Sequence, residues 1–132
     1  MKFYPDLPPR HKDLRKKRLG KIGEDFACDY LLKHHYRILD RNFQKRYGEL
    51  DIVALDGGVL VFVEVKTRIG RKFGLPEESV TPRKLHEVKQ TALYYKLLHP
   101  ELSKDLRIDV IGIELAPDET LKYFNHIQNV TL

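Results

Sequence analysis

The sequence has one cysteine and no apolar run long enough to cross a membrane. Cys28 cannot form an intrachain disulfide, so a reducing compartment such as the cytoplasm is the simplest location to expect. The longest apolar run, Val59–Val63, has the length of a strand, far short of the roughly 20 residues of a transmembrane helix. The first residues are polar and contain prolines rather than an apolar signal segment. We therefore expect a cytoplasmic protein with no membrane partner.

Positive charge is concentrated at the N-terminus. Residues 1–18 hold seven basic and two acidic side chains, whereas the other 114 residues hold 17 of each sign. This distribution predicts a flexible basic arm over residues 1–18 and a single domain over residues 19–132, a size that can bury a core. The arm is either a solvated tail or a segment attracted to a phosphate backbone.

Sequence patterns predict two helices. Leu19, Ile22 and Phe26 begin an apolar repeat at helical spacing, which predicts a helix from about Arg18 to His34. Thr81-Pro82 combines an N-cap residue with proline at the first helical position, and it predicts a second helix.

Five β-rich segments predict a sheet. Gly57-Gly58 separates two of them and predicts a tight hairpin. The order α-β-β-β-α-β-β therefore predicts an α/β fold with a mixed central sheet flanked by helices. The expected strands are Tyr36–Phe43, Glu49–Leu55, Val59–Lys66, Leu106–Leu115 and Leu121–Val130.

The hairpin brings charged residues together. Side chains alternate between the two faces of a strand, and directly paired residues share a face. If Gly57-Gly58 forms a two-residue turn, Asp51 pairs with Glu64 and Glu49 pairs with Lys66. All four polar side chains are then expected to converge on one face.

Two opposed carboxylates favour a metal site. Cross-strand Cβ atoms lie about 4.5–5.5 Å apart, so like charges repel unless a cation separates them. Oxygen ligands suit Mg²⁺ or Mn²⁺, and no His/Cys pattern indicates zinc. We expect Asp51, Glu64 and Glu49 to be the metal ligands, with Lys66 acting on a water or on a phosphate. The alternative is a half-exposed hairpin with a Glu49–Lys66 ion pair on its solvent face.

The hairpin strands also resemble a known family. Gly48–Ala54 (GELDIVA) and Val61–Arg68 (VFVEVKTR) closely resemble the YraN-type endonuclease-like family. That family belongs to the PD-(D/E)xK, or restriction-endonuclease-like, superfamily, which has Holliday-junction-resolvase-like members. Leu50 stands where the motif's name has proline. The resemblance extends to Leu19–Ala27, Arg83–Tyr95 and Leu106–Val110.

The resemblance implies a fold and an activity. The implied fold is a restriction-endonuclease-like αβββαβ core. The implied activity is that of a Mg²⁺-dependent endodeoxyribonuclease. Asp51 and Glu64 would bind the metal, Lys66 would be the catalytic lysine, and Glu24 would be an additional catalytic acid on the first helix.

Further residues are candidates for nucleic-acid contacts. Gln90 and Tyr94 resemble an element of RecB-like nucleases, although two polar residues one turn apart are also common on helices. For each basic residue, a solvated surface is the alternative to a phosphate contact. The candidates are Arg68, Arg83, Lys84, Lys89, Gln90 and Tyr94, with Arg15, Lys16, Lys17 and Arg18 of the arm.

Two functions remain open from the sequence. The first is a metal-dependent nuclease that cleaves DNA, including branched or processed DNA, for which a homodimer would suit a four-way junction. The second is a non-catalytic nucleic-acid-binding module that retains the nuclease fold. Asp109 faces away from Ile108 and Val110, and we expect it to stabilise the sheet rather than to join the acidic cluster.

Overall fold

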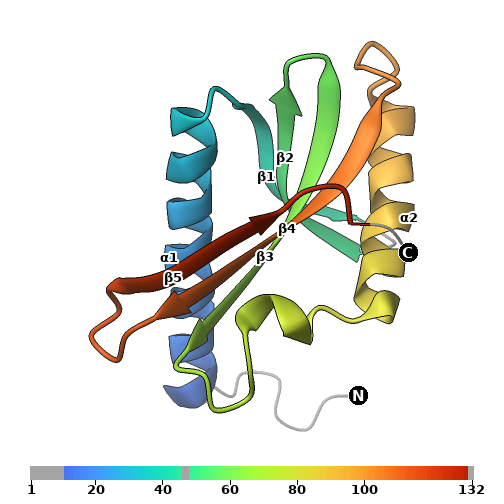
Figure 1. The fold of residues 1–132 in the computed structure, drawn as a ribbon. Coiled ribbons are helices and arrows are strands. Elements are labelled where there is room, and N and C mark those ends of the chain that lie inside the picture. Colours follow the sequence, from blue (N-terminus) through green and yellow to red (C-terminus); the bar gives the residue numbers. More distant parts are fainter. Residues whose placement is uncertain (1–10, 46–47, 131–132) are drawn as a thin grey trace, which may run out of the picture.

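A five-stranded sheet is covered by one long helix on each face (Figure 1). The computed structural model describes residues 11–45 and 48–130. The strand order is β1-β2-β3-β4-β5, with β3 and β4 parallel and the other neighbours antiparallel. The elements are α1 (His11–Lys33), β1 (Arg37–Lys45), β2 (Gly48–Asp56), β3 (Val59–Ile69), the 3₁₀ helix η1 (Pro76–Ser79), α2 (Pro82–Leu98), β4 (Leu106–Leu115) and β5 (Leu121–Ile127).

This architecture confirms the predicted α/β class and is compatible with a restriction-endonuclease-like core. The α2 helix begins as predicted, because the Thr81 hydroxyl accepts a hydrogen bond from the Lys84 backbone N–H at 3.1 Å. Within the described ranges, neither long helix has an apolar stretch that could span a membrane.

The α1 helix begins at His11 and not near Arg18 as predicted. Residues 11–18, which the sequence assigned to a flexible arm, are therefore helical. Lys, Arg and Leu are good helix formers, and no proline or glycine interrupts residues 11–19. The remainder of the predicted arm, residues 1–10, lies outside the described residues.

The hairpin between β2 and β3 has the predicted turn and register. Gly57 has a φ of +56°, which a glycine adopts without strain. The paired residues run from Asp56–Val59 to Ile52–Val63 in the predicted register, and there the pairing ends. Beyond that point β2 continues beside β1, and β3 continues beside β4. The two central strands therefore diverge, and we call this place the fork.

Alternating side chains build two separate cores. On one face, Ile52, Val61 and Val63 pack with Ala27 and Leu31 of α1. On the other face, the intervening strand residues pack against α2 in a second cluster, which includes Leu50, Val53, Leu60, Phe62, Val88, Ala92 and Tyr95. Burial on both faces confirms that β3 is an interior strand.

A glycine lets α1 approach the fork closely. A Cβ atom on Gly23 would lie 1.8 Å from the Thr67 hydroxyl of β3, so a larger residue would push the helix away. Glu24 follows Gly23 directly and is partly buried. The close contact therefore places an α1 carboxylate near the sheet.

Candidate functional site

Two carboxylates meet at the fork. The predicted Asp51–Glu64 backbone pair lies one step beyond the last paired residues. There the Asp51 carboxylate accepts a hydrogen bond at 2.8 Å from the Val65 backbone N–H, which replaces the missing strand contact. Glu64 is only 6% exposed. The structure thus brings the two acids together, although through side chains and not through the predicted backbone pairing.

The Glu64 carboxyl group lies in an unfavourable environment for a negative charge. Burial, followed by the charge of Asp51, raises the pKa of Glu64 to about 9. The nearest cation is the Lys84 ammonium, 3.8 Å from Glu64 Oε2. Among the described residues, Glu64 Oε1 has no hydrogen-bond partner although it is buried. A buried oxygen without a partner, beside a second carboxylate, indicates a site whose polar contacts are incomplete.

Lys66 follows Glu64 on the same face of β3 and is partly buried. Burial, together with the positive charges of Arg68 and Lys16, holds the pKa of Lys66 below its ordinary value. A lysine in such surroundings gives up its proton more readily than a surface lysine. It is therefore suited to proton transfer as well as to contact with an anion.

Glu24 extends the acidic cluster from α1. Burial raises its pKa, and the charge of Asp51 raises it further, against the opposing effect of Arg41 at 3.6 Å. Its Oε1 atom is buried and has no hydrogen-bond partner within the described part of the chain. Glu49 lines the same hollow as Glu24. The predicted cross-strand pairing of Glu49 with Lys66 does not form, because β2 and β3 have already separated there. The Glu49–Lys66 ion pair of the alternative interpretation is also absent among the described residues.

The donors at the fork fit a hard divalent cation. In the ranges that the structure describes, no three His, Cys, Asp or Glu side chains stand ready as a ligand set. Mg²⁺ does not require three, because it is usually held by one or two carboxylates together with waters and substrate phosphates. Asp51 and Glu64 supply two carboxylates, one with an unused oxygen. This donor set suits Mg²⁺ or Mn²⁺.

The residues at the fork lie within a segment shared with known relatives. Residues 23–113 match the uncharacterised protein family UPF0102. The chain belongs to this family. It is 47% identical over 113 residues to a UPF0102 protein of Syntrophomonas wolfei, which covers 86% of this chain and 96% of the relative. It is 42% identical over 118 residues to one of Desulforamulus reducens, covering 88% and 97%. It is 50% identical over 113 residues to one of Geobacter sulfurreducens, covering 85% and 88%.

The structure brings some of the predicted basic residues of this UPF0102 protein to the site. Lys84 lies in the first turn of α2 beside Glu64. Lys16 and Arg68 line one pocket together with Lys66. Positive charge therefore lies next to the acidic pair.

Other predicted contacts lie elsewhere. The Arg83 side chain is 91% exposed and lies 4.0 Å from Glu87. Lys89 lines a separate, largely apolar pocket between α2 and β4. Gln90 is exposed and Tyr94 is partly buried on α2. The four candidates from the predicted arm, Arg15, Lys16, Lys17 and Arg18, are all exposed on α1. Lys17 lines the same hollow as Glu24, and Arg18 forms an ion pair with Glu119.

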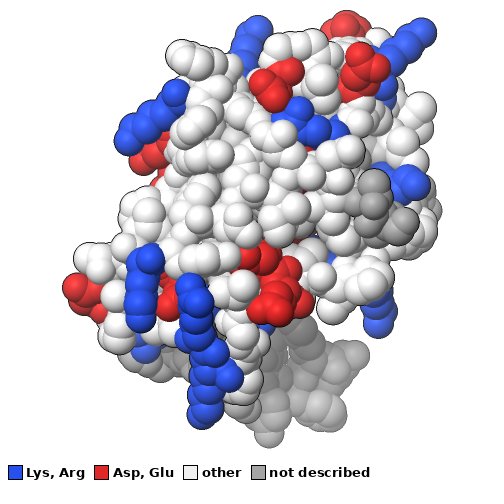
Figure 2. All heavy atoms as spheres, viewed as in Figure 1, with Lys and Arg blue, Asp and Glu red and all other residues white. Residues whose placement is uncertain are grey.

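The charges do not form one continuous basic face. On the side drawn in Figure 2, Lys and Arg side chains lie near Asp and Glu at both ends, and the middle is largely uncharged. Positive charge on this side is therefore local and not continuous.

Two residues of the site were missed from the sequence. Arg41 of β1 lies 3.6 Å from Glu24 and 2.8 Å from Asp25, and nothing local in the sequence shows this contact. Phe73, in the loop after β3, lines the same pocket as Lys66 and is 77% exposed. The sequence did contain a signal for Phe73, because a large aromatic residue between Lys72 and Gly74 is unusual in a solvated loop.

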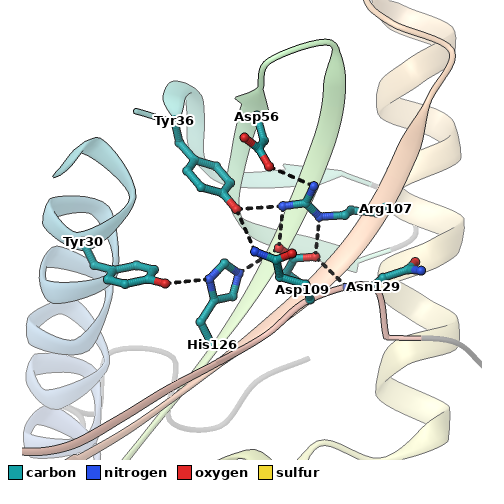
Figure 3. Close-up of polar contacts among 8 residues, drawn as sticks. Tyr30, Tyr36, Asp56, Arg107, Asp109, His126 and Asn129 are labelled. Atoms are coloured by element: carbon teal, nitrogen blue, oxygen red, sulfur yellow. Dashed lines mark hydrogen bonds and ion pairs between the residues drawn. The ribbon is translucent and has the colours of Figure 1, made fainter. Parts of the chain in front are cut away.

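The prediction that Asp109 stabilises the sheet is confirmed. Its buried carboxylate accepts hydrogen bonds from Arg107, from His126 Nε2 at 2.8 Å and from the Asn129 backbone N–H at 3.0 Å (Figure 3). Burial alone would raise the pKa of Asp109, but these donors hold it below its ordinary value. Arg107 also binds Asp56 at 3.0 Å, so this network ties β4 to the hairpin and to the segment after β5.

Proposed function

We propose that this UPF0102 protein is a metal-dependent nuclease that hydrolyses DNA phosphodiester bonds, with branched or processed DNA as its substrate. One observation carries the proposal. The buried Glu64 carboxyl group lies beside Asp51 with an unused oxygen, and Lys66 follows on the same strand face. The resemblance of the two hairpin strands to PD-(D/E)xK nucleases supports the same assignment.

The acids would hold the cation. Asp51 and Glu64 are the ligands that we assign to Mg²⁺ or Mn²⁺, with Glu24 extending the negative charge toward α1. The bound ion would polarise the scissile phosphate and lower the pKa of a water molecule. The Val65 backbone N–H fixes the Asp51 carboxylate, so the ligand position is built into the fork.

The lysines would act on the substrate. With its lowered pKa, Lys66 can accept a proton from the attacking water or donate one to the leaving oxygen. Lys84 already lies 3.8 Å from Glu64 and would contact a phosphate oxygen at the same place. A positive group that is fixed before the substrate binds stabilises developing negative charge without reorganisation.

The test is a cleavage assay on linear duplex, single-stranded, flap and four-way DNA with Mg²⁺, with Mn²⁺ and with a chelator. We expect metal-dependent cleavage that falls by about 100-fold or more in both Asp51→Asn and Lys66→Ala. The matched controls are Asp29→Asn and Lys33→Ala, exposed residues of α1. DNA binding without cleavage on every substrate, unchanged in these variants, would instead support a non-catalytic binding module.

A further inference from the structure

A pocket of about 360 Å³ opens beside Lys66 at the far end of β3. This size is near the lower end of the roughly 300–1,000 Å³ of ligand sites, which suits one nucleotide and not a stretch of duplex. Its lining residues come from α1, from β3 and from the loop that follows β3. They are Lys16, Lys66, Thr67, Arg68, Ile69, Gly70, Lys72 and Phe73.

The fork leaves one side of this pocket without a neighbouring strand. Among the described residues, β3 pairs with β2 only as far as Val63 and beyond it only with β4. The Val65 N–H points to the open side, where it meets Asp51. Because backbone groups two residues apart point the same way, the N–H groups of Thr67 and Ile69 also face this side. Backbone donors in such a position bind phosphate oxygens.

Positively charged side chains line the same pocket. Lys16, Lys66 and Arg68 line this pocket together, so three cations lie close to one another. The Arg68 Nε atom is buried and has no hydrogen-bond partner in the described ranges. Like charges gathered with an unused donor are stabilised by an anion, and a phosphate group has the matching charge and oxygens.

An exposed aromatic ring lies at the mouth of the pocket. Phe73 is 77% exposed, and the Lys72 ammonium lies 5.7 Å from its ring centroid. The loop is shaped by two glycines with positive φ, Gly70 at +71° and Gly74 at +91°. A turn bond at 3.0 Å from the Gly74 N–H to the Arg71 carbonyl closes it. The ring is thus presented to solvent by a defined turn, next to cations.

We propose that this pocket receives one unpaired nucleotide beside the scissile bond, with its phosphate on Lys66 and Arg68 and its base stacked on Phe73. The inference rests on the proposed nuclease function and narrows its substrate. Phe73 can stack only on a base whose face is free, as in a single strand or at the junction of a flap. DNA with a single-stranded segment is therefore the preferred substrate, ahead of continuous duplex.

Tryptophan fluorescence gives a direct test, because the chain has no tryptophan. Phe73→Trp places a single reporter at the pocket, and Leu97→Trp places one on α2 at a residue that is 78% exposed. Both are titrated with an oligothymidylate of about 15 nucleotides in chelator, a length within the roughly 4–16 nucleotides that single-strand sites cover. We expect quenching in Phe73→Trp and none in Leu97→Trp.

Binding constants complete the test. Phe73→Ala should weaken oligothymidylate binding about tenfold, the scale of base–aromatic stacking, and Phe73→Tyr should restore it. The proposed nucleotide pocket is overturned if oligothymidylate quenches both tryptophan variants equally, or if Phe73→Ala binds it as tightly as the wild type does. Quenching without cleavage of any DNA in Mg²⁺ or Mn²⁺ upholds the pocket and overturns the nuclease. If Phe73→Ala cleaves flap and duplex DNA with the same ratio of rates as the wild type, the pocket proposal is overturned and the nuclease proposal stands.

Discussion

Two clusters of charged side chains lie on the neighbouring strands β3 and β4, and they differ in how completely their hydrogen bonds are formed. Each carboxylate oxygen of Asp109 accepts bonds from two donors. The nearest cation to Glu64 is at 3.8 Å, and one of its oxygens has no partner among the described residues. Both groups are buried, with Asp109 at 0% and Glu64 at 6% exposure.

The same burial therefore has opposite consequences. The pKa of Asp109 is held below its ordinary value, whereas the pKa of Glu64 rises to about 9. A completed network stabilises the charged form and fixes the strands around it. An incomplete one leaves a group that gains from a ligand of opposite charge, which is the usual condition of functional sites. Asp109 thus belongs to a structural cluster and Glu64 to a candidate site, a distinction that follows from their hydrogen bonds.

Breaking the completed network should have the largest effect on stability. Arg107→Met removes the cation from buried Asp109 and should lower the free energy of unfolding by about 3–5 kcal/mol, the usual result of breaking a buried ion pair. Urea denaturation followed by circular dichroism measures the loss. Arg83→Met, in an ion pair whose Arg83 side chain is 91% exposed, is the control and should change stability by less than about 0.5 kcal/mol. Equal effects of the two variants would remove the distinction.

Changing the incomplete site should have the opposite sign. In the folded protein Glu64 keeps its proton up to about pH 9, whereas in the unfolded chain it loses it near its ordinary pKa of 4.5. Between these values the folded state binds more protons than the unfolded state, so stability falls as the pH rises. In chelator, Glu64→Gln should therefore stabilise the protein at pH 8 by on the order of 2 kcal/mol.

Thermal unfolding of both proteins at pH 5 and pH 8 checks this prediction. The difference should be small at pH 5, because pH 5 lies only about half a unit above the ordinary pKa of 4.5 and little of the pH-dependent cost has developed there. A gain of equal size at both pH values would show that titration of Glu64 is not its cause. Added Mg²⁺ should raise the melting temperature of the wild type more than that of Glu64→Gln, since only the wild type has the second carboxylate.

Removing one neutral contact from the completed network should have the smallest effect. The Tyr30 hydroxyl lies 3.0 Å from His126 Nδ1 at the edge of that network. Tyr30→Phe should lower the free energy of unfolding by about 0.5–1.5 kcal/mol, the net worth of one hydrogen bond. Denaturation and the cleavage assay measure it together, and we expect cleavage to be unchanged. A selective loss of cleavage would place the network in the chemistry.

Local signals predicted much of the fold. Gly57-Gly58 set the turn and the register as far as Ile52–Val63, and Thr81-Pro82 set the start of α2. These signals suffice because turn geometry and capping depend on residues next to each other in the chain. The predicted start of α1 was wrong, because the charge of residues 11–18 led to their assignment to a flexible arm although their helix propensity is high.

The candidate site was predicted only in part. Alternation of side chains along the strands predicted that Asp51 and Glu64 lie together. It could not show that β2 and β3 separate directly after the Ile52–Val63 pair. The resulting bond from the Val65 N–H to Asp51 depends on how β1 and β4 draw the two strands apart. Lys84 was a candidate for DNA contact, and its position beside Glu64 comes from the packing of α2.

By itself, then, the sequence determined the order of the elements, the hairpin and the identity of the acidic pair, because each depends on neighbours along the chain or on strand alternation. Only the tertiary structure decided which carboxylate is completed and which is left open. The donors to Asp109 come from β4, β5 and the segment after it, up to 20 residues away. Burial and long-range hydrogen bonds set the charge state of a carboxyl group, and both exist only once the helices have packed on the sheet.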